Sequence, residues 1–180
     1  MKVKLEIKNR WTGKVIFEFE TENNTISKTV NEYVRIARAN LTDADLTRAN
    51  LTDADLTRAN LTRANLTDAD LLRFKSDLWR VLLMNRLEVS GLKKALIEGR
   101  IDGTKYEGEC ACLKGTIANV KECLIEKIPG MVKNVNEPSE QWFLQIKKGD
   151  NLENSNVIKK TVEWIEEFEL LISDNIKETE

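Results

Sequence analysis

The sequence predicts a mixed α/β fold organised around a short repeat solenoid, on three observations. Seven consecutive pentapeptides occupy residues 39–73. Alternating apolar and charged residues precede them, and amphipathic helical patterns follow them. We therefore expect a β-hairpin with a capping helix over residues 1–38, the solenoid over residues 39–73, and a small α+β module over residues 74–180.

The first part of the chain predicts a β-hairpin. Apolar and charged residues alternate over residues 3–7 and again over residues 15–19, as expected for strands with one buried face. The polar stretch Asn9–Gly13 lies between them and suits the connecting turn. We therefore expect two antiparallel strands joined close to Gly13.

A helix is expected to follow the hairpin and to enter the first repeat. Apolar residues recur at helical spacing over residues 26–37, and Thr25 suits the N-cap position. Such a helix would cover the open end of the solenoid. Alternatively, residues 34–38 form an eighth pentapeptide centred on Ile36. We favour the helix because the apolar positions upstream continue into it.

The repeats have a period of five, which suits neither a helix nor a flat strand. A helix turns about 100° per residue and would scatter the leucines around its surface. A strand would send successive leucines to opposite faces. A solenoid gathers them, because each pentapeptide forms one side of a coil and points its leucine inward. The repeated leucines are Leu41, Leu46, Leu51, Leu56, Leu61, Leu66 and Leu71, each preceded by an alanine two positions earlier.

These units, ANLTD and ADLTR among them, resemble the pentapeptide-repeat family, whose pattern is A(D/N)LXX. The resemblance implies a right-handed quadrilateral β-helix with four pentapeptides per coil. Seven repeats make less than two coils, so flanking segments must cover both ends.

The charges of the repeats predict the register between coils. Residue i should stack on residue i+20, about 4.8 Å away. The charges alternate with a ten-residue period through Arg58, after which a second consecutive Arg-bearing unit shifts the phase. Opposite charges then stack, in the pairs Asp43 with Arg63, Arg48 with Asp68, and Asp53 with Arg73. The alternative is repeat slippage in the gene, with the match arising by chance. Because arginines neutralise much of the acidity, DNA mimicry is less favoured than occlusion.

The composition bounds the chemistry. The 180 residues carry a net charge of −2, so no basic field is available to hold nucleic acid. The chain has no histidine, which removes Ser-His-Asp and Cys-His nucleophile systems and HExxH metal sites. No signal peptide or membrane-spanning segment is visible. We expect a cytoplasmic, non-catalytic protein that needs no cofactor and makes no direct contact with nucleic acid or membrane.

The C-terminal module predicts two short helices after the repeats, over residues 76–86 and 90–99. Ser76 and Ser90 suit their N-caps, and Gly99 suits the end of the second. We expect their apolar faces to cover the second end of the solenoid.

A short strand and a long helix are expected further along. Residues 142–146 predict the strand, and residues 148–154 a polar turn. A final helix should begin at Ser155 or Asn156. Its apolar stripe is expected to contain Ile158, Val162, Ile165, Phe168 or Leu171, and Ile172.

A wider resemblance covers nearly the whole chain. The segments KLEIKNRWTGKVIFEFE (4–20), DGTKYEGECACLKGTIANV (102–120) and WFLQIKKGDNLENSNVIKKTVEWIEEFE (142–169) are similar, together with the repeats, to a phage and prophage family. Its members pair a short pentapeptide-repeat solenoid with a cysteine-containing GECAC module. The resemblance implies a virus-encoded accessory protein in the host bacterial cell. Counter-defence is expected by analogy.

Three interpretations of Cys110, Cys112 and Cys123 are open. A zinc site would have at most three soft ligands, and the usual C-x₂₋₄-C spacing is absent. A reactive thiol would lack an obvious base. We favour small core residues that lead into a helix, and we expect no metal.

The same segment offers a small-ligand site. A glycine turn before a helix over about residues 110–119 would present free backbone N–H groups to a phosphate. Ordinary capping and packing is the alternative. A pocket for a nucleotide-like signal would be lined by Lys105, Tyr106, Gly108, Cys110, Cys112, Lys114, Thr116, Asn119, Lys148 and Asp150.

The function that we favour is occlusion of a host protein by a non-catalytic binding protein. The expected contacts are outward-facing acids of the repeats and of the acidic last helix, together with Trp11 and Trp79 where they are exposed. Homo-oligomers are also expected, because solenoid ends leave apolar surface. The acids in question are Asp43, Asp53, Asp68, Glu166 and Glu167.

Overall fold

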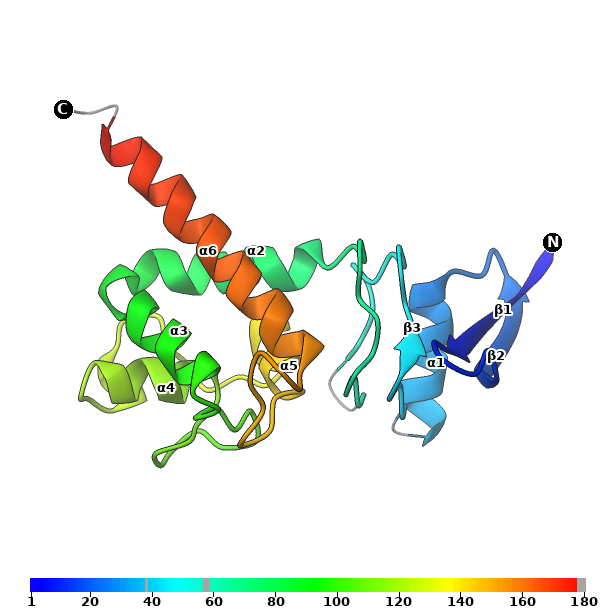
Figure 1. The fold of residues 1–180 in the computed structure, drawn as a ribbon, viewed down its shortest axis with the longest axis horizontal. Coiled ribbons are helices and arrows are strands. Elements are labelled where there is room, and N and C mark those ends of the chain that lie inside the picture. The colour runs from blue at the N-terminus through cyan, green and yellow to red at the C-terminus, as the bar shows by residue number, and fades with distance from the viewer. Residues whose placement is uncertain (38, 57–58, 178–180) are drawn as a thin grey trace.

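The computed structural model describes residues 1–37, 39–56 and 59–177. The hairpin and first helix lie at one end of an elongated molecule, the repeats in the middle, and the helical C-terminal part at the other end (Figure 1). The elements are β1 (Lys2–Asn9), β2 (Val15–Glu22), α1 (Ile26–Ala37), β3 (Ala44–Asp45), α2 (Leu72–Met84), η1 (Arg86–Glu88), α3 (Val89–Ile97), α4 (Leu113–Val120), η2 (Ile125–Lys127), α5 (Pro138–Phe143) and α6 (Asn156–Lys177).

The N-terminal hairpin and helix are present as predicted. β1 pairs antiparallel with β2, and β3 of the repeats joins the other edge of β1 through Lys8 opposite Asp45. Thr25 Oγ1 accepts a hydrogen bond from the N–H of Lys28 at 3.2 Å, which caps α1. The helix runs to Ala37, so α1 and not an eighth pentapeptide occupies residues 34–37; residue 38 lies outside the described part. The sheet therefore continues into the first repeats.

The repeats form two layers, residues 39–56 and 59–71, whose leucines point inward. All seven repeat leucines are buried. Residues twenty positions apart pair in parallel, which is the offset of four pentapeptides. The buried leucines and the offset agree with the prediction from the period of five. The pairs are Asn40 with Asn60, Asp45 with Asn65, and Asn50 with Asp70.

The charge register is confirmed for two of the three predicted pairs. Arg63 Nε and Nη2 donate to the two carboxylate oxygens of Asp43, both at 2.9 Å. Arg48 lies 3.9 Å from Asp68. The prediction for Asp53 and Arg73 is wrong, since no ion pair joins these two described residues. The Arg73 guanidinium instead lies 5.9 Å from the ring centroid of Phe74, the third residue of α2. Arg58, where the simple alternation ends, is outside the described residues.

Polar side chains cover both ends of the repeat layers. On the hairpin side, Ser27 Oγ of α1 donates to Asn50 O at 2.7 Å, and Asn31 Oδ1 accepts the N–H of Asp55 at 2.6 Å. α1 therefore covers this end, as predicted.

The covering of the second end differs from the prediction. Gln145 Nε2, just after α5, donates to Leu56 O at 2.6 Å, and Asn156 Nδ2 donates to Ala64 O at 2.7 Å. These hydrogen bonds come from the turn after α5 and from α6, not from the helices expected over residues 76–86 and 90–99.

Both expected N-caps of those helices are wrong. α2 begins at Leu72, inside the last pentapeptide, and its N-cap residue Leu71 makes no side-chain capping hydrogen bond. Asp70 Oδ1 accepts the N–H of Leu72 at 3.1 Å, the same turn that Asn50 and Asn60 make with the residue two positions further on. Ser76 lies inside α2, and its hydroxyl donates to the carbonyl of Arg73. α3 begins at Val89, so Ser90 is also internal. Gly99 does follow the end of α3, with φ +69°, as predicted.

The predicted strand at residues 142–146 is wrong. Pro138 occupies the first turn of α5, a position that tolerates its missing N–H, and the helix runs to Phe143. Trp142 is buried and donates from Nε1 to Thr161 Oγ1 at 2.8 Å. This contact joins α5 to α6.

The last helix is present with the predicted start. Ser155 Oγ accepts the N–H of Ile158 at 3.3 Å and caps α6. Of the two stripe alternatives, Phe168 is buried and Leu171 is 49% exposed. No helix in the described part of the chain is long and apolar enough to cross a membrane.

Candidate functional site

The predicted ligand-binding segment surrounds α4, and its lysine has a structural role. Lys114 is fully buried. Its ammonium donates to Val132 O and to Glu137 Oε2, both at 2.5 Å. The charge is thereby neutralised inside the module and joins α4 to the loop before α5.

The N-terminus of α4 is covered by Glu140 of α5, which is buried. Glu140 Oε1 is buried and makes no hydrogen bond to the residues that the structure describes. Burial raises the pKa of Glu140, and the neighbouring Cys112 thiol, the Lys114 ammonium and the Lys114 backbone N–H oppose that rise. The carboxyl group thus lies where we expected a phosphate.

The Cys112 side chain is part of this packing. Burial and the neighbouring Glu140 carboxylate raise the pKa of the Cys112 thiol to about 12. The residue is the N-cap of α4, so it leads into a helix as the core interpretation predicts. Tyr106 lies in the same environment, and burial followed by Glu140 raises the pKa of its hydroxyl to about 12.

Other predicted ligand residues are held by local hydrogen bonds. Thr116 is buried, and its hydroxyl donates to Ala111 O at 3.0 Å. Asn119 Nδ2 donates to Gly108 O at 2.7 Å and closes the glycine turn. These contacts favour the capping and packing alternative for this segment.

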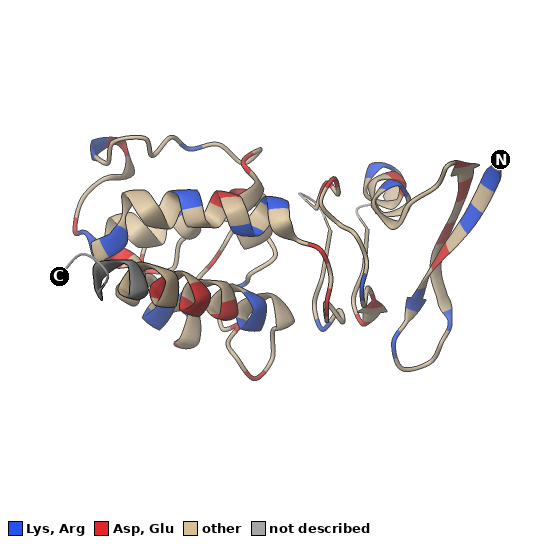
Figure 2. Ribbon diagram, turned by 90° about the horizontal axis from the view of Figure 1, so that it is seen from above, with Lys and Arg blue, Asp and Glu red and all other residues tan. Residues whose placement is uncertain are grey.

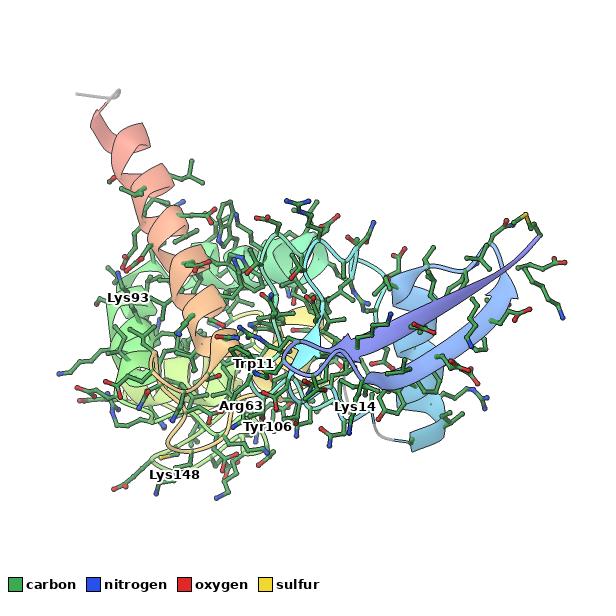
Figure 3. All side chains as sticks on the ribbon, turned by 45° about the vertical axis from the view of Figure 1, so that its right-hand side comes forward. Trp11, Lys14, Arg63, Lys93, Tyr106 and Lys148 are labelled. Carbon is green, nitrogen blue, oxygen red and sulfur yellow. The ribbon has the colours of Figure 1, made fainter. Side chains whose placement is uncertain are left out.

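The remaining predicted ligand residues are dispersed. Lys105 lies 3.3 Å from Asp102. Asp150 accepts the N–H of Lys147 at 2.9 Å within its own turn, and Lys148 is exposed. Figure 3 labels Tyr106 and Lys148 on separate loops. None of Lys105, Lys148 and Asp150 borders the two hollows described next.

A large open hollow lies on the outer side of α4. It has a volume of about 950 Å³ and a mixed lining of two cations, two carboxylates and smaller residues. A second hollow of about 200 Å³ shares Gly108, Asn119 and Cys123 with it and also borders Tyr106. The lining of the larger hollow is Arg100, Gly108, Glu109, Ala118, Asn119, Glu122, Cys123, Leu124 and Lys127.

The cysteines are free thiols, and Cys110 and Cys123 are partly exposed. Cys123 borders both hollows, whereas Cys112 borders neither. Among the residues that the structure describes, no group of three or more Cys, Asp or Glu side chains is arranged to hold a metal ion.

Exposed apolar side chains lie at the C-terminal ends of α2 and α4, on η1 and on the loops that follow α4, and one of them, Leu124, borders the larger hollow. Leu87 is 90% exposed, Val132 67% and Leu124 62%. We call this surface the distal apolar end. It comprises Leu83, Met84, Leu87, Val120, Leu124 and Val132.

Three contacts bring its segments together. The Met84 side chain lies against Gly130, and Val120 lies against Gly91. Lys121 is 3.2 Å from Glu88. The end of α2 therefore lies against the loop after η2, and the end of α4 lies against the start of α3 and against η1, all at the left of Figure 1.

The predicted protein-contact acids are largely paired within the chain. Lys93 lies 3.2 Å from Glu166 and 2.8 Å from Glu169, and Lys75 pairs with Glu167. Asp43 and Asp68 pair with arginines of the repeats, as described above. Of these five acids, Asp53 has no described ion-pair partner. Intramolecular pairing leaves the repeats and α6 with little unbalanced acidity.

The two tryptophans predicted as protein contacts, Trp11 and Trp79, differ in their exposure. Trp11 is 72% exposed at the hairpin turn. Trp79 is only partly exposed, and its Nε1 donates to Trp164 O at 2.9 Å between α2 and α6.

The distal apolar end is not among the surfaces predicted from the sequence. A signal for it is present in the sequence: Leu82, Leu83 and Met84 are consecutive and Leu87 follows. A single buried stripe of a helix cannot contain all four of these apolar residues.

Comparison with known proteins supports one part of the chain. Residues 37–71 match the family described as pentapeptide repeats, in eight copies. This segment is a pentapeptide-repeat segment. No curated protein and no solved structure matches the chain. The pentapeptide-repeat match ends before α2, so the distal apolar end lies outside it.

Proposed function

We propose that the protein is a non-catalytic binding protein that occludes the surface of another protein. The single observation that carries the proposal is the distal apolar end, where Leu87 is 90% exposed and where Leu124, 62% exposed, borders an open hollow of about 950 Å³. Contiguous exposed apolar side chains with a polar rim are typical of protein-binding surfaces. The likeness to phage-encoded accessory proteins makes a bacterial host protein the expected partner.

The repeats serve in this proposal as the spacer between the hairpin and the distal apolar end. We infer that they form the right-handed quadrilateral β-helix of their family. The parallel pairing of residues twenty positions apart supports four pentapeptides per coil. The bidentate contact of Arg63 with Asp43 favours a structural role for these charges over DNA mimicry.

Site-specific photo-crosslinking tests the proposed surface. A photoreactive amino acid at Leu87 should crosslink to one bacterial protein in cells that express the chain. The same amino acid at Leu170, which is 64% exposed on α6, is the matched control. A Leu124→Asp substitution should abolish the crosslink from position 87, because it places a charge among the apolar side chains of the distal apolar end. Equal crosslinking from both positions, or no effect of Leu124→Asp, would refute the proposal.

A further inference from the structure

A second pocket lies where three distant parts of the chain meet. Its volume is about 220 Å³. The walls come from the hairpin turn, the second layer of repeats and the first turns of α6. The lining residues are Arg10, Asn65, Leu66, Thr67, Asn156, Lys159, Lys160 and Glu163.

The charge of this pocket is positive. Three cations line it against one carboxylate, and Lys160 neutralises that carboxylate at 2.7 Å from Glu163. Arg10 and Lys159 therefore supply unbalanced charge. Figure 2 shows the same asymmetry along α6, with blue near its start and red farther along.

The acids near Arg10 are already held by other groups. Asp43 makes the bidentate contact with Arg63. Asp45 accepts the hydroxyl and the N–H of Thr47, at 2.6 Å and 3.1 Å. The Arg10 guanidinium donates to the Arg63 carbonyl at 3.2 Å, a contact that fixes its position and leaves further N–H donors.

The helix start adds to this field. α6 is 22 residues long and has no acid in its first turn, so no side chain opposes the positive end of its dipole there. Asn156, the first residue of α6, lines the pocket. Cations from separate segments and the start of a long helix together suit a phosphate group.

An exposed aromatic ring stands at the rim. The Arg10 guanidinium lies 4.5 Å from the Trp11 ring centroid. Trp11 is 72% exposed, which leaves ring surface open to a planar group. Figure 3 labels Trp11 close to Arg63, beside the start of α6.

The geometry points to a binding site for a phosphate that carries an aromatic base. The phosphate would lie between Arg10 and Lys159, and the base would stack on Trp11. A pocket of about 220 Å³ holds the phosphate and its sugar and leaves the base outside, at the tryptophan. Free nucleotides and single-stranded nucleic acid share this chemistry. The site is distinct from the distal apolar end, so it stands or falls independently of the proposed function.

Calorimetric titration with adenosine monophosphate, adenosine, inorganic phosphate and a short oligodeoxyadenylate tests the site. We expect the monophosphate to bind more tightly than either adenosine or phosphate. Lys159→Ala should weaken its binding about tenfold, the effect of losing one charge-assisted contact. Trp11→Ala should weaken monophosphate binding and leave phosphate binding unchanged. Lys148→Ala, which removes an exposed charge elsewhere, is the control and should have no effect.

The outcomes separate the two sources of the ligand. An oligonucleotide that binds more tightly than the monophosphate, with the same dependence on Lys159 and Trp11, would identify single-stranded nucleic acid. Equal or weaker binding of the oligonucleotide would identify a free nucleotide. Absence of binding by both would overturn the inference, as would equal weakening by Lys148→Ala. Thermal unfolding of each variant verifies that it is folded.

Discussion

Asn156 donates from its side-chain Nδ2 to the carbonyl oxygen of Ala64 at 2.7 Å, where a third layer of repeats would place a backbone N–H. The equivalent carbonyl one layer earlier, that of Ala44, accepts the backbone N–H of Asn65 at 2.8 Å. The start of α6 thus continues the hydrogen-bonding pattern of the repeats with a side-chain amide. This contact helps to explain how fewer than two coils can be stable without further repeats.

Removing that amide should destabilise the protein. Asn156→Ala leaves the partly buried carbonyl of Ala64 without this partner, so we expect the free energy of unfolding to fall by about 1–2 kcal/mol. Asn136→Ala, at an exposed loop position, is the matched control and should stay within about 0.5 kcal/mol of the parent. Urea denaturation of both variants measures the difference. Equal stability of the two variants would contradict the capping role of Asn156.

Two glycine substitutions should have very different effects. A Cβ at Gly103 would lie 1.8 Å from the carbonyl oxygen of Phe143, whereas one at Gly91 would meet only the Val120 side chain. The backbone of Phe143 cannot move aside as a side chain can, so Gly103→Ala should lower the free energy of unfolding by about 3 kcal/mol. Gly91→Ala should cost less, about 1–2 kcal/mol, because the Val120 side chain must shift but the helix propensity of α3 improves. Thermal unfolding compares them; a milder effect at Gly103 than at Gly91 would contradict the close packing.

The buried lysine should behave as a structural residue. Lys114→Met leaves the carbonyl of Val132 without this donor and leaves Glu137 with Arg80 at the longer distance of 3.6 Å, so we expect a loss of about 3 kcal/mol. Glu137→Gln in the same chain should recover part of it, because the carboxylate that has lost its closest cation is then absent. Lys94→Met removes a lysine of an exposed pair and should cost less than about 1 kcal/mol. Denaturant titration of the four proteins, parent included, tests this order. A Lys114→Met variant as stable as the parent would exclude the structural role.

The three thiols should differ in reactivity. Burial raises the pKa of Cys112 to about 12, so very little thiolate forms near neutral pH. Iodoacetamide should therefore modify Cys112 far more slowly than Cys110 or Cys123, both of which are partly exposed. Mass spectrometry of the digested protein gives the three rates, and in denaturant they should converge. Rapid native labelling of Cys112 would contradict its place under α5.

The ion pair between the repeat layers should be visible in a titration. The Arg63 guanidinium holds the pKa of Asp43 below its ordinary value. The carboxylate form is thus favoured in the folded state, and the associated stability is present above the unfolded pKa and lost as pH falls through the folded pKa. NMR titration should show this midpoint rise in Arg63→Ala and stay unchanged in Arg73→Ala. An unchanged Asp43 midpoint in both variants would show that the pair is absent in solution.

The repeats and the hairpin could be predicted from sequence because their signals are local and periodic. Few structures bury a leucine at every fifth position, and the alternation of apolar and charged residues over residues 3–7 directly predicts a strand. The start of α6 was also accessible, since Ser155 is followed by a clear apolar stripe. These features depend on neighbours in the sequence.

The errors arose where distant contacts decide the structure. α2 begins at Leu72, before Ser76 is reached, and Phe74 in its first turn packs against Trp142 of α5, with the ring centroids 5.7 Å apart. Trp142 lies in a helix because Pro138 begins one and Thr161 of α6 accepts the indole N–H. In the predicted ligand segment, Glu140 of α5, far along the sequence, lies near the N-terminus of α4 and favours the packing alternative. Sequence spacing alone contained no signal for that contact.

The most direct test of the proposed function is native mass spectrometry of tag-free protein after incubation with extract of a bacterial host. The account predicts a retained macromolecule whose complex is lost in the Leu87→Asp variant and kept in Leu170→Asp. A complex that survives Leu87→Asp unchanged would contradict binding through the distal apolar end. Retention of a small molecule alone would contradict occlusion and would direct attention to the pocket between Arg10 and Lys159.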